Sequence, residues 1–181
     1  MKKKYEVIQE EISDCGVSCL LSIIRYYGGD ASLENLRISS LTTKDGVNAY
    51  NLIECAKENG FDAKGLREFD LNKLTLPCIL HIKNKFPHFV CLYKIDGNSL
   101  TIMDPGYGFK KVDINTFKES YTGNSIILFP IVKLNKDRSS NVVNKKIISE
   151  TAQLTIEIML NSDKNIILLA TPILFFFSFV L

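Results

Sequence analysis

The chain changes its secondary-structure pattern once, near Gly60, and this change narrows the folds that it can adopt. Before Gly60, apolar residues recur at helical spacing in three segments, which begin near Asp14, Ser32 and Ala49. After Gly60, short apolar runs alternate with turn signals such as Asp96-Gly97-Asn98. The runs that we expect to form strands span residues 78–82, 89–93, 100–103 and 125–129. Helices in one half and strands in the other predict an α+β fold, with the N-terminal helices packed on an antiparallel sheet.

The first expected helix begins with a cysteine. Ser13 and Asp14 are favourable N-cap residues, and apolar positions after Cys15 continue at helical spacing until Gly28. Cysteine is a strong nucleophile only as the thiolate, and unpaired backbone N–H groups in the first turn of a helix stabilise that anion. Cys15 is therefore a candidate nucleophile, although most single cysteines are small buried hydrophobes.

The remaining cysteines and the overall charge argue against several other classes of protein. Five cysteines, with no Cys-x-x-Cys pair and no signal-peptide core at the N-terminus, indicate a reducing cytosol. A net charge of +2 does not indicate a nucleic-acid partner. Two histidines without ligand-type spacing to a cysteine argue against zinc, and no motif asks for a cofactor. We expect buried, unreactive side chains at Cys19, Cys55, Cys78 and Cys91.

The two histidines are the candidates for a general base. His81 lies in the middle of an expected strand, where it could be a facing residue on a half-exposed sheet. His88 follows Phe86-Pro87 at the start of the next strand, a position from which an imidazole can project into a cleft. We therefore predict His88 as the base and keep His81 as the alternative.

Asp104 and Gln9 are candidates to complete a thiol peptidase site. Asp104 precedes Pro105-Gly106, which is a turn sequence, but its carboxylate could also orient an imidazole toward Cys15. Gln9 precedes the candidate nucleophile by six residues, and its amide could either face solvent or join the backbone N–H of Cys15 in an oxyanion hole. A nucleophile, a base, an orienting acid and oxyanion donors are the parts that such a peptidase needs.

The segment after residue 130 differs from the expected domain over residues 1–130. Residues 131–163 are expected to form a polar linker and an amphipathic helix that could lie along a membrane surface. Residues 164–181 are uncharged from Ile166 onward and are expected to be a transmembrane helix that is cut short, with a core helix as the alternative. Basic residues outnumber acids between Lys133 and Lys164, which places this side of the membrane in the cytoplasm.

The candidate site residues stand in an order that resembles a known family. It is the papain-like peptidase domain at the N-terminus of bacterial peptidase-containing ABC transporters, which mature and export bacteriocins and peptide pheromones. The resemblance covers residues 5–130. The family signature is a glutamine, Asp-Cys-Gly, Cys-Leu three residues later, His-Phe-Val and Asp-Pro. This chain has Gln9, Asp14-Cys15-Gly16, Cys19-Leu20, His88-Phe89-Val90 and Asp104-Pro105.

The resemblance implies a cysteine endopeptidase that cleaves precursor peptides after a double-glycine-type leader, through an acyl-enzyme. It implies Cys15 as nucleophile, His88 as base, Asp104 as orienting residue and Gln9 in the oxyanion hole. It also implies attachment to the cell membrane through the C-terminal helix, with the peptidase facing the bacterial cytoplasm. A full transporter of this kind would be a homodimer.

Transporters of this family continue into six membrane helices and a nucleotide-binding domain. This chain has no Gly-x-x-x-x-Gly-Lys-Ser/Thr phosphate loop and stops inside what resembles the first membrane helix. The resemblance therefore implies a fragment or a truncated gene, with the transporter core on another polypeptide or missing. The alternative function is a leader-docking domain without catalysis. A third possibility, a small membrane-anchored structural protein, would account for the largely apolar residues 164–181 but not for the four candidate site residues.

Overall fold

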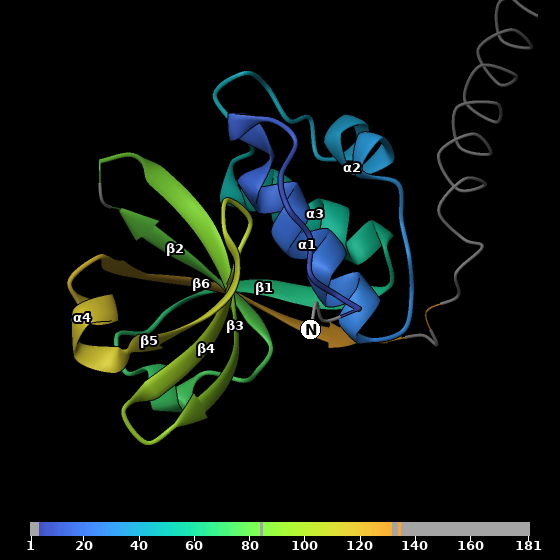
Figure 1. Ribbon diagram of the computed structural model, residues 1–181. Coiled ribbons are helices and arrows are strands. Elements are labelled where there is room, and N and C mark those ends of the chain that lie inside the picture. The colour runs from blue at the N-terminus through green and yellow to red at the C-terminus, as the bar shows by residue number, and fades with distance from the viewer. Residues whose placement is uncertain (1–3, 84, 132–133, 135–181) are drawn as a thin grey trace, which may run out of the picture. The chain divides into compact units, whose positions relative to one another are not determined.

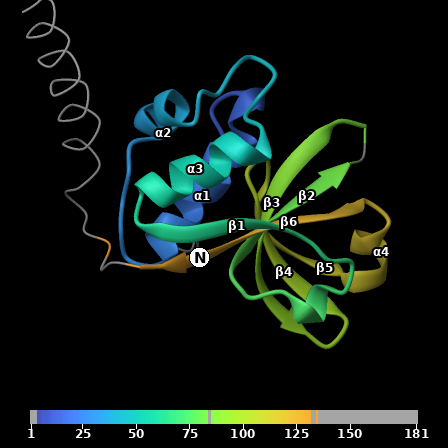
Figure 2. The same cartoon turned by 180° about the vertical axis from the view of Figure 1, so that it is seen from behind.

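The computed structural model describes residues 4–83, 85–131 and 134, and these form an α+β domain. Three helices, α1 (Cys15–Tyr26), α2 (Leu33–Ser39) and α3 (Ala49–Glu58), gather on one side of a six-stranded antiparallel sheet (Figure 1). The view from behind shows the same separation of helices and strands (Figure 2). The predicted fold class is therefore confirmed, including the antiparallel sheet.

The three helices begin where the sequence predicts, and α1 and α3 end near the predicted glycines. Asp14 and Ser32 occupy the N-cap positions of α1 and α2, and the Asn48 side chain caps α3 by accepting from the backbone N–H of Asn51 at 2.8 Å. Gly28 follows α1 with a φ of 87°, a conformation that side chains disfavour and glycine adopts freely. The side chains of Asp14 and Ser32 make no cap hydrogen bond of their own, so of these three helices only α3 is capped in this way.

The sheet has the strand order β1-β6-β2-β3-β4-β5. The strands are β1 (Phe61–Arg67), β2 (Cys78–Lys83), β3 (Pro87–Asp96), β4 (Ser99–Asp104), β5 (Gly108–Asp113) and β6 (Tyr121–Pro130). Four of them contain the predicted runs. The prediction lacks β1 and β5 because most of their side chains are exposed and give no apolar run, as is typical of strands at the two edges of a sheet. A short helix, α4 (Ile114–Lys118), connects β5 to β6.

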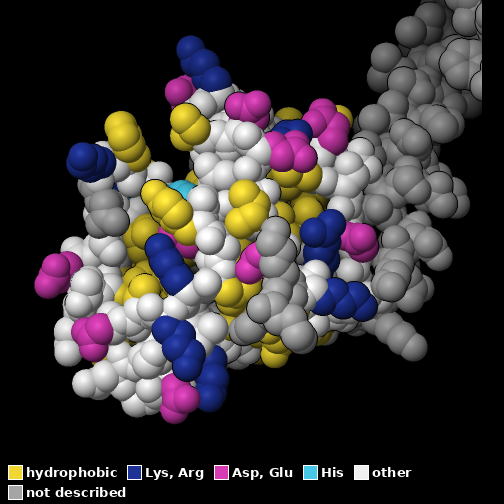
Figure 3. Space-filling view, viewed as in Figure 1, with side chains coloured by type: hydrophobic (Ala, Val, Ile, Leu, Met, Phe, Trp, Pro, Cys, Tyr) yellow, Lys and Arg dark blue, Asp and Glu magenta, His cyan; other side chains and the backbone are white. Residues whose placement is uncertain are grey.

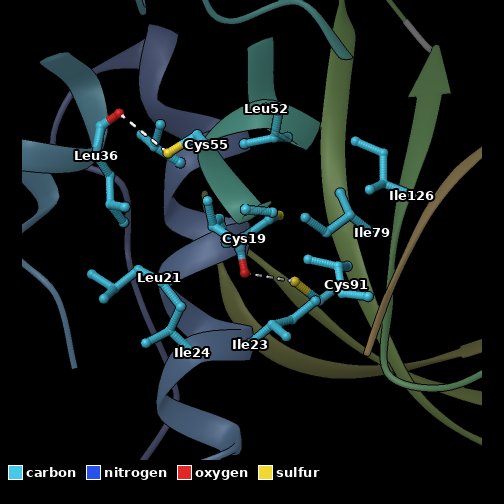
Figure 4. Close-up of a cluster of buried hydrophobic side chains, with 14 of the residues drawn as sticks. Cys19, Leu21, Ile23, Ile24, Leu36, Leu52, Cys55, Ile79, Cys91 and Ile126 are labelled. Carbon is cyan, nitrogen blue, oxygen red and sulfur yellow. Dashed lines mark hydrogen bonds between the residues drawn. The ribbon is translucent and has the colours of Figure 1, made fainter. Parts of the chain in front are cut away.

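Two clusters of buried side chains hold the domain together. One lies between the helices and the sheet and includes Ile23, Leu52 and Ile79 (Figure 4). The other lies on the opposite face of the central strands and includes Leu80 and residues of α4. Successive residues of β2 thus point into different clusters, so this strand, which carries His81, is buried on both faces. As predicted, full burial is found at Cys19, Cys55, Cys78 and Cys91.

The predictions for the C-terminal segment lie outside the described residues. They are the linker and amphipathic helix over residues 131–163, of which only 131 and 134 are described, and the truncated transmembrane helix over 164–181. Within the part of the chain that the structure describes, no helix is long and apolar enough to cross a membrane.

Candidate active site

Cys15 is the first residue of α1 and is partly exposed, unlike the four other cysteines. It directly follows a short 3₁₀ helix, η1 (Ile12–Asp14). Backbone N–H groups at the start of a helix have no intrahelical partner and favour an anion nearby. The prediction that Cys15 begins a helix is confirmed.

Asp14 anchors the start of this helix in a way that the sequence prediction missed. It occupies the N-cap position, but its side chain makes no cap hydrogen bond within α1. Its carboxylate is only 1% exposed and accepts from the Glu11 backbone N–H at 2.7 Å and from two nitrogens of Arg37 at 2.9 and 2.7 Å. The hydrogen bonds from Arg37 lower the pKa of Asp14, so the buried carboxylate stays charged. Arg37 therefore ties α2 to the residue before Cys15.

Replacing Arg37 by methionine is expected to lower the free energy of unfolding by about 3 kcal/mol, because it leaves the carboxylate of Asp14 buried without its cationic partner. Urea denaturation of the wild-type chain and the variant measures this loss. The matched control is Arg25→Met, which removes an exposed ion pair with Asp30 and is expected to cost less than about 1 kcal/mol. Equal losses in the two variants would contradict the anchoring role of Arg37.

His88 and Asp104 form a direct ion pair beside Cys15. The Nε2 atom of His88 donates to Oδ1 of Asp104 at 2.9 Å. Burial alone would lower the pKa of His88, but hydrogen bonds with Asp104 and Cys15 outweigh it and raise the pKa to about 9. Because Nε2 is bound to Asp104, Nδ1 is the ring nitrogen left for Cys15. The structure thus brings together the three residues that the sequence singled out as nucleophile, base and orienting acid.

Asp104 is held by three donors and is almost fully buried, with 3% exposure. In addition to His88, the backbone N–H of Gly106 donates to Oδ1 at 3.0 Å, and Lys110 Nζ donates to Oδ2 at 2.8 Å. Burial raises the pKa of Asp104, but the hydrogen bonds from His88, Lys110 and Gly106 lower it to about 2. Asp104 is therefore ionised at neutral pH. Lys110 is a site residue that the sequence analysis missed, because the sequence of a strand does not show which carboxylate a lysine side chain will pair with.

Gln9 lies next to the turn that follows Asp104. Its backbone N–H donates to the carbonyl of Pro105 at 2.9 Å, which joins the N-terminal segment to the hairpin between β4 and β5. Its side-chain Oε1 is buried without a hydrogen-bond partner among the described residues. This oxygen is a hydrogen-bond acceptor, whereas an oxyanion would have to be bound by the NH₂ group of the same amide. The role of Gln9 as an oxyanion donor stays a prediction.

A cleft of about 520 Å³ opens beside Cys15. Its lining is mostly apolar and includes Val47 from the loop before α3 and Ile79 and Phe89 from the central strands. His81 also lines it, with Nδ1 at 3.0 Å from the Thr122 hydroxyl and not beside Asp104. The space-filling view shows a histidine, one of the two in the chain, in cyan next to hydrophobic side chains in yellow (Figure 3). A cleft of this size and character can hold an extended peptide next to the thiol.

The two histidines are expected to titrate at well separated pH values, because among the described residues only His88 has an anionic partner. His88 should keep its second proton until about pH 9. Burial, with repulsion from Lys83 and His88, lowers the pKa of His81 below its ordinary value of 6.5. Since the chain has only these two histidines, NMR titration of the ring protons resolves both. Two signals that both titrate near pH 6.5 would contradict the His88–Asp104 ion pair.

Comparisons with known proteins show which family the chain belongs to. The model of the Peptidase C39 family matches residues 3–133. The pediocin PA-1 transport/processing ATP-binding protein PedD of Pediococcus acidilactici is 37% identical over 139 residues, which are 72% of this chain and 19% of that protein. The lactococcin-G-processing and transport ATP-binding protein LagD of Lactococcus lactis is 33% identical over 68% of this chain and 18% of that protein. The chain therefore spans about a fifth of the length of these curated relatives.

Solved structures of single domains match over nearly their whole length. The peptidase domain of Streptococcus ComA, a bifunctional ABC transporter of a quorum-sensing pathway, is 34% identical with a TM-score of 0.65. The match covers 70% of this chain and 98% of that domain. A double glycine motif protease from an AMS/PCAT transporter, solved in complex with the leader peptide, is 35% identical with a TM-score of 0.65. That match covers 69% of this chain and 90% of the protease.

Proposed function

Because the chain belongs to the peptidase C39 family, we propose that it is a cysteine endopeptidase that removes double-glycine-type leaders from bacteriocin or pheromone precursors. The observation that carries the proposal is the His88–Asp104 pair beside a partly exposed Cys15 at the start of a helix. A domain that only docks leaders needs an apolar cleft but has no use for a charged imidazole next to a thiol.

The catalytic steps follow from the positions of these groups. The thiolate of Cys15 attacks the carbonyl carbon of the last leader residue, and the carbonyl oxygen takes the negative charge. The protonated His88 gives its proton to the leaving amine as the peptide bond breaks, which leaves an acyl-enzyme on Cys15. His88 then takes a proton from water, and the resulting hydroxide attacks the acyl carbon. The leader leaves as a carboxylic acid, and Cys15 is released as the thiolate beside protonated His88. Asp104 keeps the imidazole oriented and stabilises its charge throughout.

The oxyanion of both steps needs hydrogen-bond donors. We assign this role to the backbone N–H of Cys15 and to the side-chain amide of Gln9, which is attached to the Asp104 turn through the carbonyl of Pro105. Preorganised donors of this kind stabilise the charge that develops on the carbonyl oxygen without reorganising during the reaction.

The substrate is a precursor peptide whose leader lies in the cleft beside Cys15. Apolar residues such as Val47, Ile79 and Phe89 suit apolar leader side chains. Two glycines at the end of the leader would let its main chain pass close to the thiol without a clash. In the cell, the domain would face the bacterial cytoplasm, be attached to the membrane through residues 164–181, and work as a homodimer coupled to ATP-driven export.

The test is a cleavage assay with two matched peptides, followed by mass spectrometry. The first carries a leader that ends in Gly-Gly, and the second has the final glycine replaced by valine. We expect cleavage after the second glycine of the first peptide and little turnover of the second. Equal cleavage of both, or cleavage at other bonds, would contradict a double-glycine leader peptidase.

A further inference from the structure

His81 is built into the cleft wall but takes no part in the catalytic steps above. It lies on the same face of β2 as Ile79, and both residues line the cleft together with Cys15. The ring of Phe89, directly opposite on β3, lies 5.2 Å from the imidazole between ring centroids. The imidazole is thus half-buried and held in place beside the substrate path.

A distortion in the neighbouring strand places a hydroxyl against this imidazole. The register between β2 and β6 shifts between Leu80 and Ile82, so the residues around Gly123 bulge opposite His81. Gly123 has a φ of 81°, and a Cβ atom there would lie 2.6 Å from the ring of Phe69. Only glycine fits this position well, and bulges of this kind redirect side chains. Here the bulge brings the Thr122 hydroxyl within 3.0 Å of Nδ1 of His81.

The hydrogen bonds of Thr122 determine which ring nitrogen of His81 carries the proton. Thr122 Oγ1 donates its single proton to the carbonyl oxygen of His81 at 2.9 Å. Oγ1 can then only accept from the ring, so Nδ1 of His81 is the protonated nitrogen. Nε2 of the neutral ring therefore presents a lone pair as a hydrogen-bond acceptor. Burial lowers the pKa of His81, which keeps the ring neutral at neutral pH.

We propose that Nε2 of His81 is a substrate-binding acceptor that receives a hydrogen bond from a main-chain N–H of the leader peptide in the cleft. The inference rests on the proposed peptidase function and names one of its recognition groups. A peptide that enters an apolar cleft gives up the water on its backbone N–H groups, and each one needs a new acceptor. A leader end made of glycines has no side chains to recognise, so the enzyme must read its main chain.

The test compares His81→Phe with His81→Gln in the full 181-residue chain. Phenylalanine keeps a ring but has no acceptor, whereas glutamine can place its amide oxygen near the position of Nε2. With a precursor whose leader ends in Gly-Gly, His81→Phe is expected to raise KM about tenfold, because it leaves a buried N–H unpaired, with kcat nearly unchanged. His81→Gln is expected to recover most of the loss. Thermal unfolding shows whether each variant is folded.

A second measurement separates binding from catalysis. Calorimetry of the same precursor with Cys15→Ala, alone and combined with His81→Phe, should show Kd raised by a similar factor. Unchanged KM and Kd in folded His81→Phe would overturn the inference. A folded His81→Gln whose KM is raised as much as that of His81→Phe would also overturn it. Either outcome leaves the proposed function intact, since the wild-type chain still cleaves. A wild-type chain that neither cleaves nor binds the precursor would overturn the function and this inference together.

Discussion

Replacing Cys15 by alanine is expected to lower kcat for leader cleavage by about 10⁴-fold or more, because the variant cannot form the acyl-enzyme. The loss should come without a change in the affinity for the leader, since the thiol contributes little to the apolar cleft. Steady-state kinetics of cleavage and calorimetry of precursor binding, on the same preparations, measure the two quantities.

The matched control is Cys19→Ala, one helical turn further along α1. Cys19 is fully buried in the cluster between the helices and the sheet, so its loss should lower stability slightly and leave kcat close to the wild-type value. Normal turnover by Cys15→Ala, or an equal loss of kcat in both variants, would remove Cys15 from the role of nucleophile.

Replacing His88 by alanine is expected to lower kcat by roughly 10³-fold or more, since the imidazole protonates the leaving amine and activates water. The variant also leaves the carboxylate of Asp104 with Lys110 and Gly106 as its remaining partners, so its charge stays neutralised and the fold should persist. The pH dependence of kcat should be measured for the wild-type chain and for His88→Ala. The part of the wild-type profile that reflects titration of the imidazole should be missing from the profile of the variant.

The control for this prediction is His81→Ala. His81 is bound to Thr122 and not to Asp104, so kcat should remain close to the wild-type value while KM rises. A reversal, with His81→Ala inactive and His88→Ala active, would transfer the role of base to His81, which the sequence alone kept open.

The parts of the fold that could be predicted are those set by local chemistry. N-cap residues, glycines after helices and continuous apolar runs predict the three helices and the four inner strands. The edge strands β1 and β5 could not be predicted in this way, because they bury few side chains. Backbone pairing holds them in the sheet, β1 with the distant strand β6 and β5 with the preceding strand β4. A pattern of apolar residues does not reveal such backbone hydrogen bonds.

The candidate site was predictable where residue type alone suggests a role. Cys15, His88 and Asp104 are a nucleophile, a base and an acid, and their order resembles a family signature. Arg37 and Lys110 carry no such signal, because an exposed arginine or lysine looks the same in sequence whether or not it reaches a buried carboxylate. The ion pairs that these two residues make with Asp14 and Asp104 could therefore be found only in the structure.

The most direct test of the account is to treat the chain with iodoacetamide and then follow both labelling and cleavage of a Gly-Gly precursor by mass spectrometry. The account predicts that Cys15 is alkylated well before the four buried cysteines and that cleavage stops in proportion to this label. Saturable precursor binding without cleavage, with Cys15 no more reactive than Cys19, would contradict it and indicate a docking domain that does not use its catalytic residues.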